Sequence, residues 1–373
     1  MRKIMPVILM LALALSSGCW DKVEIDRRSF VTGIGLDLNE GDGLDRFIVT
    51  YEYPNINAVG KDVTEDQKTF MISIPSSSVF QAGRKFTTKV AFPFYYKHVK
   101  VLLLGEDLVN EGKLVREILD ELNRDTKINK KVQILATRGR AKSIMETEMK
   151  RNRTTEGAIY TMTKDGAKNS NRFTPRTLTE FIRNADYSDA TLIPRVLLEG
   201  GELMVSGGCI MKNYEHVAWI GERENRALSI INGRTKLDTI DIPYRDSIVS
   251  FTITDAKSTK DVKIGKDIVM DIPIRLEGYL QGYAASRHRT VYDEKALGDM
   301  EMAIEKFMQR EVNRVLKLIQ EEYNADIVGV GEHLRKFNHK EWRSIEDRWD
   351  EVFPEVKFNP SIDVNIRRTG LIR

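Results

Sequence analysis

The sequence predicts a multi-domain protein of the α+β or mixed α/β class. Its 373 residues exceed the usual size of one compact domain. With 41% hydrophobic and 30% charged residues, the composition is typical of folded chains and excludes a disordered one. Strand-like and helical segments alternate in the first half, whereas several strands precede one long helix in the second. We expect an N-terminal domain over residues 19–197 and a C-terminal α+β domain over residues 198–373, with a possible small separate module near residues 198–240.

The charge balance argues against nucleic-acid binding. The chain carries 58 Lys and Arg against 55 Asp and Glu, a formal net charge of +3. Such a balance lacks the basic excess that holds a phosphate backbone, so we expect no nucleic-acid partner. No apolar stretch after residue 18 approaches the roughly 20 residues that a membrane-spanning helix needs, which excludes a polytopic membrane protein.

The first 19 residues have the organisation of a signal peptide that ends in a cysteine. Arg2 and Lys3 precede the uncharged residues 4–15, a run too short to span a bilayer. Small residues then lead to Cys19, as in a bacterial lipobox, although serine stands where leucine is usual three residues before the cysteine. We predict that residues 1–18 are removed and that diacylglycerol on Cys19 anchors the protein to membrane lipid. A plain secretory signal or a buried N-terminal helix is the alternative.

The N-terminal half begins with a predicted hairpin. Residues 30–38 and 47–53 have strand composition and are joined by a glycine-rich turn. Residues 76–78 then offer serines that cap a helix through residue 88. Residues 99–104, 113–123 and 132–136 follow as strand, helix and strand, and this spacing predicts a parallel βαβ-like unit covered by helices. Further helices are expected at 141–149 and 178–184, with an exposed loop or a loosely packed helix over 150–175.

The C-terminal half is predicted to be a mainly antiparallel sheet packed by a long helix. Hairpin-like residues 202–220 and a short helix at 222–230 precede several strands within 240–283. Residues 295–323 place apolar side chains at steps of three and four, which gives one wide apolar helical face. Two shorter helices, at 327–337 and 341–350, and an alternating strand at 362–366 complete this half.

The second short helix carries aromatic side chains. Trp342, Ile345, Trp349 and Phe353 are spaced so that they share one face of a helix. We expect this face to pack beneath the long helix, with a tryptophan edge at a protein interface as the alternative.

No catalytic constellation is evident. Ser206 lies in VSGGC, which does not match the GxSxG nucleophile elbow, and no phosphate-binding P-loop motif occurs. The pairs Gly33–Gly35 and Gly329–Gly331 lack the third glycine of a dinucleotide loop. Cys209 is a lone thiol in a strand-like run and is expected to be buried. Carboxylates cannot be paired from sequence, so a glycosidase-like dyad stays open.

Metal binding is not expected either. His333 and His339, beside Glu332 and Glu341, are the best candidate ligands. Six residues along a helix turn through about 600°, so the two rings would face different ways. We predict no catalytic residue, no metal site and no cofactor.

Motifs at both ends of the chain resemble one family. GCWDKVEID (residues 18–26) with GIGLD (33–37) is similar to the start of the Ger(x)C family, the C subunits of spore germinant receptors in endospore-forming bacteria. ADIVGVGE (325–332) resembles the family's ADIFGFGE-like segment, WDEVFP (349–354) its WDEIFP, and IRRTG (366–370) its ending.

The resemblance implies a lipid-anchored, non-enzymatic subunit of a nutrient germinant receptor that is required for spore germination. It would lie on the outer face of the spore inner membrane and assemble with the A and B type membrane subunits. One alternative is a lipid-anchored solute-binding protein that captures a nutrient directly, favoured by a deep cleft between two similar lobes. A cell-wall hydrolase on a lipid anchor is favoured only if two carboxylates converge in a cleft.

Overall fold

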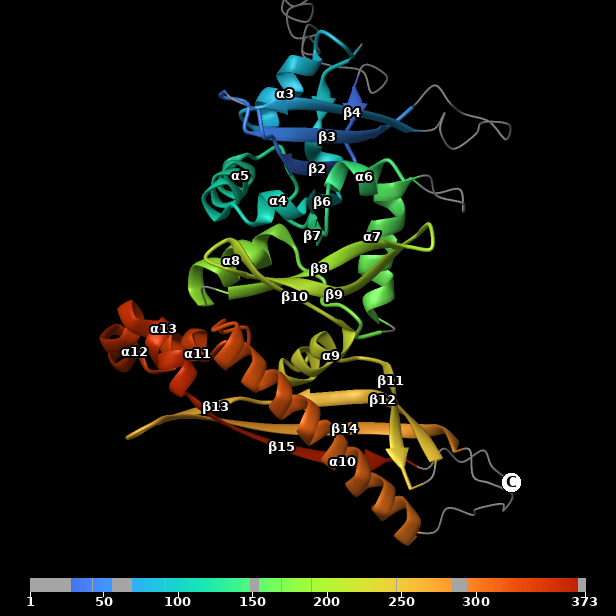
Figure 1. Ribbon diagram of the computed structural model, residues 1–373, viewed down its shortest axis with the longest axis vertical. Coiled ribbons are helices and arrows are strands. Elements are labelled where there is room, and N and C mark those ends of the chain that lie inside the picture. The colour runs from blue at the N-terminus through green and yellow to red at the C-terminus, as the bar shows by residue number, and fades with distance from the viewer. Residues whose placement is uncertain are drawn as a thin grey trace, which may run out of the picture.

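The computed structural model describes residues 28–41, 43–55, 69–90, 92–147, 154–168, 170–188, 190–245, 247–283 and 294–367. The predicted signal peptide and Cys19 lie outside these residues. Within them the chain forms a large N-terminal sheet and a smaller C-terminal sheet, with helices between the two (Figure 1). The predicted mixed α+β architecture is confirmed.

The N-terminal sheet has eight strands in the order β10-β9-β8-β7-β6-β2-β3-β4. Its bounds are β2 Gly33–Leu38, β3 Phe47–Pro54, β4 Thr69–Ser76, β6 Val101–Leu104, β7 Gln133–Thr137, β8 Ala190–Glu199, β9 Glu202–Lys212 and β10 Glu215–Ile220. The central strands β2, β6, β7 and β8 are parallel, and antiparallel hairpin strands flank them on both sides. The predicted β2–β3 hairpin and the βαβ unit formed by β6, α5 (Gly112–Arg124) and β7 are both confirmed. A short parallel pair, β1 (Ser29–Phe30) and β5 (Phe94–Tyr95), lies apart from this sheet.

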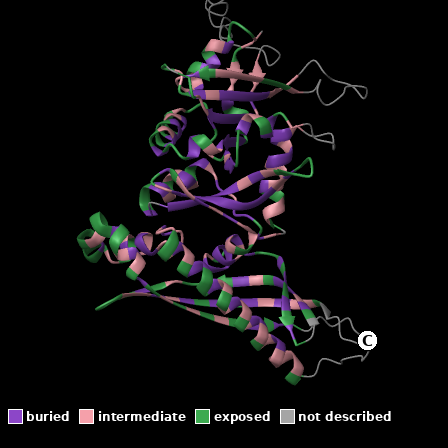
Figure 2. Ribbon diagram, viewed as in Figure 1, coloured by how far each residue is buried: buried purple, intermediate pink, exposed green. Residues whose placement is uncertain are grey.

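Helices cover both faces of the parallel strands. Along β6, Leu102 and Leu104 enter one apolar cluster with α3 (Val79–Phe86), α4 (Glu106–Val109), α5 and α8 (Leu178–Ser188). Val101 and Leu103 enter a second cluster with α6 (Ala141–Met145) and α7 (Thr155–Asp165). Both faces are buried, which explains why the strand is continuously apolar instead of alternating. Figure 2 shows this burial along the middle of the sheet.

Helix α7 lies in the segment expected to be an exposed loop or a loosely packed helix. It begins after Thr154, whose hydroxyl accepts a hydrogen bond from Gly157 N at 3.0 Å. Ala158 and Ile159 are buried beneath it. The helix forms in a polar sequence because the few apolar residues fall on the side that packs on the sheet.

The C-terminal sheet has five strands, β11 Asp238–Tyr244, β12 Ser247–Ser258, β13 Asp261–Ile264, β14 Ile268–Tyr283 and β15 Lys357–Ile366. All of its pairings are antiparallel except that of β15, which runs parallel to β14. The long helix α10 (Glu294–Lys317) lies across this sheet (Figure 1) and continues as a π-helical turn over Leu318–Glu322. The predicted sheet and long helix are therefore confirmed.

The final strand is integrated into this half. Val364 and Ile366 are buried against α10. Their backbone N–H groups donate to Glu305 Oε1 at 3.1 Å and Glu301 Oε1 at 2.8 Å, respectively. Helix α10 thus supplies both apolar contacts and hydrogen-bond acceptors to β15.

The aromatic segment near the C-terminus is not the single helix that was predicted. It forms α12 (His339–Ile345) and α13 (Trp349–Val352), separated by a 3-10 turn and preceded by α11 (Val330–Phe337). The helix breaks because Ile345 and Arg348 adopt φ of −126° and −122°, outside the helical range. Trp342 and Trp349 are nevertheless buried, as expected. Their rings pack edge to face with 5.1 Å between centroids.

The N-terminal sheet continues across residue 198. That position falls inside β8, and β9 and β10 extend the same sheet to residue 220. One face of these strands packs on α9 (Glu222–Ile231) and belongs to the apolar cluster of the C-terminal sheet. The two halves therefore share a core, and the domain boundary near residue 198 stays a prediction.

The long helix should tolerate change on one face only. On the face of α10 that packs on the sheet, Ile304 is 1% exposed, whereas Met302 on the outer face is 60% exposed. We expect Ile304→Ala to lower the free energy of unfolding by about 2–5 kcal/mol, and Met302→Ala by at most ~0.5 kcal/mol. Urea denaturation of both variants measures the difference. Equal losses would show that α10 does not pack on the sheet through this face.

Candidate functional site

The cysteine and serine that the sequence singled out are structural. Cys209 on β9 is fully buried, as predicted, and its sulfur lies 3.4 Å from that of Met211. Burial raises the pKa of this thiol far above its ordinary value, which opposes nucleophilic reactivity. Ser206 is 3% exposed and donates a hydrogen bond to Glu222 at 2.8 Å.

One pair of buried carboxylates does converge. Glu52 on β3 accepts a hydrogen bond from the backbone N of Glu156 on α7 at 3.0 Å, and Lys100 Nζ lies 3.2 Å from Glu156 Oε1. Burial, and then repulsion from Glu156, raises the pKa of Glu52 to about 8. The two residues are 1% and 4% exposed, so a polysaccharide cannot reach them. This pair belongs to the core and does not favour the hydrolase interpretation.

The two candidate histidines do not meet in a ligand set. His333 on α11 packs its ring against Phe337 at 4.7 Å between centroids, and His339 begins α12 in an exposed position. Over the ranges that the structure describes, no group of three or more His, Cys, Asp or Glu side chains is placed to hold a metal ion.

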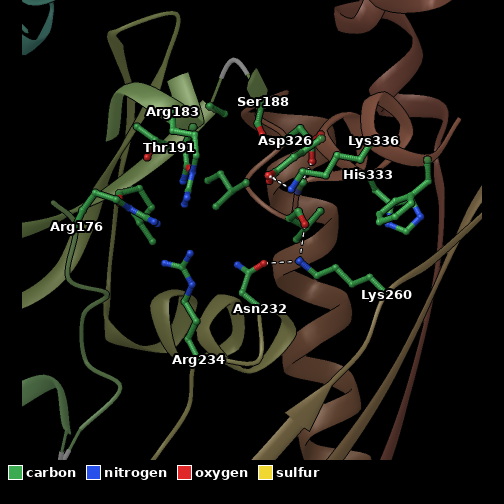
Figure 3. A pocket seen from close by; sticks show the side chains of 18 residues that line it. Arg176, Arg183, Ser188, Thr191, Asn232, Arg234, Lys260, Asp326, His333 and Lys336 are labelled. Carbon is green, nitrogen blue, oxygen red and sulfur yellow. Dashed lines mark hydrogen bonds and ion pairs between the residues drawn. The ribbon is translucent and has the colours of Figure 1, made fainter. Parts of the chain in front are cut away.

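A polar cavity of about 260 Å³ lies between the two halves of the chain. Figure 3 shows Arg176, Arg183 and Thr191 on one side, Asn232 and Arg234 of the turn after α9 beneath them, and Asp326, His333 and Lys336 on the other side. Its charged lining residues are Arg176, Arg183, Arg234, Lys260, Lys336, Asp326 and Glu332. Cations outnumber carboxylates, so the cavity carries an excess of positive charge.

Three arginines dominate one side of the cavity. Arg176 is 4% exposed and its Nε donates to Leu192 O of β8 at 3.1 Å. When the Asn184 amide is oriented so that its nitrogen donates to Glu180 O, its oxygen accepts from Arg176 Nη1 at 3.2 Å. Burial, followed by repulsion from Arg234, lowers the pKa of Arg176. Arg183 and Arg234 are exposed at the rim, and Figure 3 shows their guanidinium groups directed toward that of Arg176.

The opposite side is built from the ADIVGVGE segment. The Asp326 carboxylate accepts hydrogen bonds from Gly329 N at 2.8 Å, Val330 N at 3.0 Å and Gly331 N at 2.7 Å, which satisfies the first N–H groups of α11. Gly329 has φ +80°, where a side chain would be strained, and a Cβ on Gly331 would lie 3.0 Å from the Trp342 ring. Asp326, Gly329 and Gly331 thus each have a structural role at the cavity edge.

The two lysines of the cavity are already engaged. Lys260 Nζ donates to Asn232 Oδ1 and to Val328 O, both at 2.5 Å, and burial lowers its pKa to about 8. Lys336 Nζ lies 2.6 Å from Glu332 Oε1. Lys336 thus has a carboxylate partner, whereas Lys260 contacts neutral oxygens, so the positive charge without a carboxylate in contact resides on Lys260 and the three arginines.

Comparison with known proteins identifies the family. The family described as "Spore germination protein N-terminal domain" matches residues 21–198, and that described as "Spore germination B3/ GerAC like, C-terminal" matches residues 206–370. The chain belongs to the Ger(x)C family. Residues 199–205 separate the two matched regions.

Relatives of this Ger(x)C protein match over nearly its whole length. Spore germination protein YndF of Bacillus subtilis (strain 168) is 24% identical over 395 residues, covering 98% of this chain and 96% of the relative. Spore germination protein B3 of the same organism is 24% identical over 374 residues, covering 98% and 97%. The crystal structure of the GerBC protein matches with a TM-score of 0.58 and 21% identity, covering 90% of this chain and 97% of that one, which shows the shared fold.

Sequence analysis identified only part of the functional residues. The predicted lipidation site, Cys19, lies outside the described residues, and its lipidation stays a prediction. The cavity arginines were missed because they are distant in the chain and belong to no motif; the ADIVGVGE segment was the one signal near them. Within the described ranges, no helix has both the length and the apolar character needed to cross a bilayer.

The buried carboxylate pair should make stability depend on pH. The ordinary pKa of Glu52 is 4.5 and its folded value is about 8, so the folded state retains a proton that the unfolded chain loses in between. Its contribution to stability is present below pH ~4.5 and is lost as the pH rises through ~8.

The free energy of unfolding of the wild-type protein should therefore fall between pH 5 and pH 9. We expect this fall to be smaller in Glu52→Gln, by roughly 1 kcal/mol or more. Urea denaturation at several pH values measures it. Glu199→Gln, at an exposed position, is the matched control and should keep the wild-type profile. Identical profiles for wild type and Glu52→Gln would contradict the assignment.

Proposed function

We propose that this protein is a lipid-anchored, non-enzymatic subunit of a nutrient germinant receptor. The family match through both halves of the chain carries this proposal, and a role in spore germination follows from membership itself. The core positions of Cys209 and of the Glu52–Glu156 pair agree with a role that does not depend on catalysis.

The anchor is proposed from the sequence before residue 20. A cationic start, a short apolar run and small residues before Cys19 support this proposal. Several acyl chains on this cysteine would hold the protein on the outer face of the spore inner membrane.

The proposed partners are the A and B type membrane subunits of the receptor. Spore germination proteins B3 and A3 of Bacillus subtilis (strain 168), each 24% identical to this chain, align over 98% and 99% of it. Such full-length similarity supports an equivalent place in a germinant receptor complex.

Direct nutrient capture is the second candidate, and the cavity between the halves is the observation that favours it. A solute-binding protein was expected to close two similar lobes over a cleft. Here the lobes differ, since an eight-stranded mixed sheet faces a five-stranded, mainly antiparallel one. The receptor-subunit role therefore remains the better supported.

Lipidation is tested by replacing the predicted acceptor. We expect Cys19→Ala to abolish incorporation of an alkyne-tagged fatty acid and to leave most of the protein unprocessed or soluble after membrane fractionation. Cys209→Ala, which removes the other cysteine of the chain, is the control and should remain labelled. A processed Cys19→Ala protein that stays membrane-bound would show that something other than acyl chains retains it.

Receptor assembly is tested by affinity purification of the tagged wild-type chain from spore inner membranes. Co-purification of the polytopic A and B type subunits is the expected result. Recovery of the chain without them, together with tight nutrient binding by the isolated protein, would favour the solute-binding function instead.

A further inference from the structure

We propose that the cavity between the two halves binds a small multivalent anion through carboxylate or phosphate oxygens. The proposal does not rest on the receptor role, because it concerns the chemistry of the cavity alone. Its basis is the convergence of Arg176, Arg183 and Arg234 on one space (Figure 3).

These arginines lack countercharges at contact distance. Among the described residues, no carboxylate forms an ion pair with any of the three, whereas Lys336 is paired with Glu332. Glu180 attracts Arg176 and Arg234 from nearby, but its carboxylate accepts hydrogen bonds from the N–H and hydroxyl of Thr177, both at 2.9 Å. Positive charges that face one another without a counter-ion repel, and a bound anion relieves that repulsion.

Arginine is also the side chain best suited to such a ligand. Its planar fork of N–H donors matches carboxylate and phosphate geometry, and these charge-assisted hydrogen bonds are stronger than neutral ones. Arg176 is held in place from the buried side by its bond to Leu192 O, so one recognition group is already oriented before a ligand arrives. The rim arginines, being exposed, are free to close on the ligand.

The volume is compatible with a small ligand. A cavity of about 260 Å³ has room for several water molecules, and therefore for a small anion in their place. Inorganic phosphate and a short dicarboxylate such as succinate are anions of this size.

The lining comes from both halves, so the ligand would bridge them. Arg176 and Arg183 precede β8 in the N-terminal half, whereas Arg234, Lys260 and Lys336 follow α9. An anion bound by Arg176 or Arg183 of the N-terminal half and by Arg234, which follows α9, would therefore stabilise the relative position of the two halves as well as the local fold.

Isothermal titration of the full-length chain in detergent tests the proposal, with phosphate, succinate and acetate added at constant ionic strength. We expect saturable binding of phosphate or succinate and much weaker binding of acetate. Whichever of the two divalent anions binds more tightly identifies the oxygen chemistry that the site prefers. Unfolding midpoints should rise with the ligand that binds.

The decisive comparison uses two double variants of equal charge. The double variant Arg183→Gln with Arg234→Gln should bind the anion at least about ten-fold more weakly, because each of its two substitutions removes a charge-assisted contact. Arg84→Gln with Arg343→Gln, two exposed arginines outside the cavity lining, should leave affinity unchanged. Thermal melts without ligand verify that both fold. Equal affinities in the two variants, or no saturable binding of either divalent anion below ~10 mM, would overturn the proposal.

Discussion

The organisation of the whole molecule depends on burying the second face of strands β8, β9 and β10. Helices of the N-terminal half cover one face of these strands, and α9 with the C-terminal core covers the other. Leu192 and Ile210 thus belong to the same apolar cluster as Ile304 of the long helix. Because apolar burial is the main favourable contribution to folding, neither half can withdraw from the other without exposing part of its core.

Polar contacts then determine how the halves meet. Thr174, which precedes α8, hydrogen-bonds to Asn225 and Ser229 of α9 at 3.1 Å each, within a buried environment. At the other side of the junction, Lys212 of β9 donates to Asn324 O at 2.6 Å and pairs with Asp350 at 2.7 Å. Buried polar groups need specific partners, so the contacts of Thr174 favour one relative orientation of the halves over others that would bury the same apolar area, and the more exposed Lys212–Asp350 pair adds to them.

Local patterns in the sequence predicted the fold better than they predicted the site. The run at residues 99–104 and the stripe of the long helix reveal burial directly, because their periodicity reports which side chains face a core. Helix α7 was harder to recognise, since its few apolar residues acquire meaning only beneath the sheet. The cavity could not be foreseen at all, because Arg176 and Arg234 become neighbours only after β8 and α9 have packed. Sequence spacing carries no information about such a distant pair.

The carboxylates of α10 have a consequence for the outer edge of the C-terminal sheet. By accepting from Val364 N and Ile366 N respectively, Glu305 and Glu301 occupy donors that an unpaired edge strand would otherwise present to a neighbouring chain. Exposed edges promote sheet-to-sheet aggregation, and native proteins commonly block them with charged side chains. A copy crowded against others on a surface would therefore find the C-terminal end of this edge blocked to intermolecular strand addition.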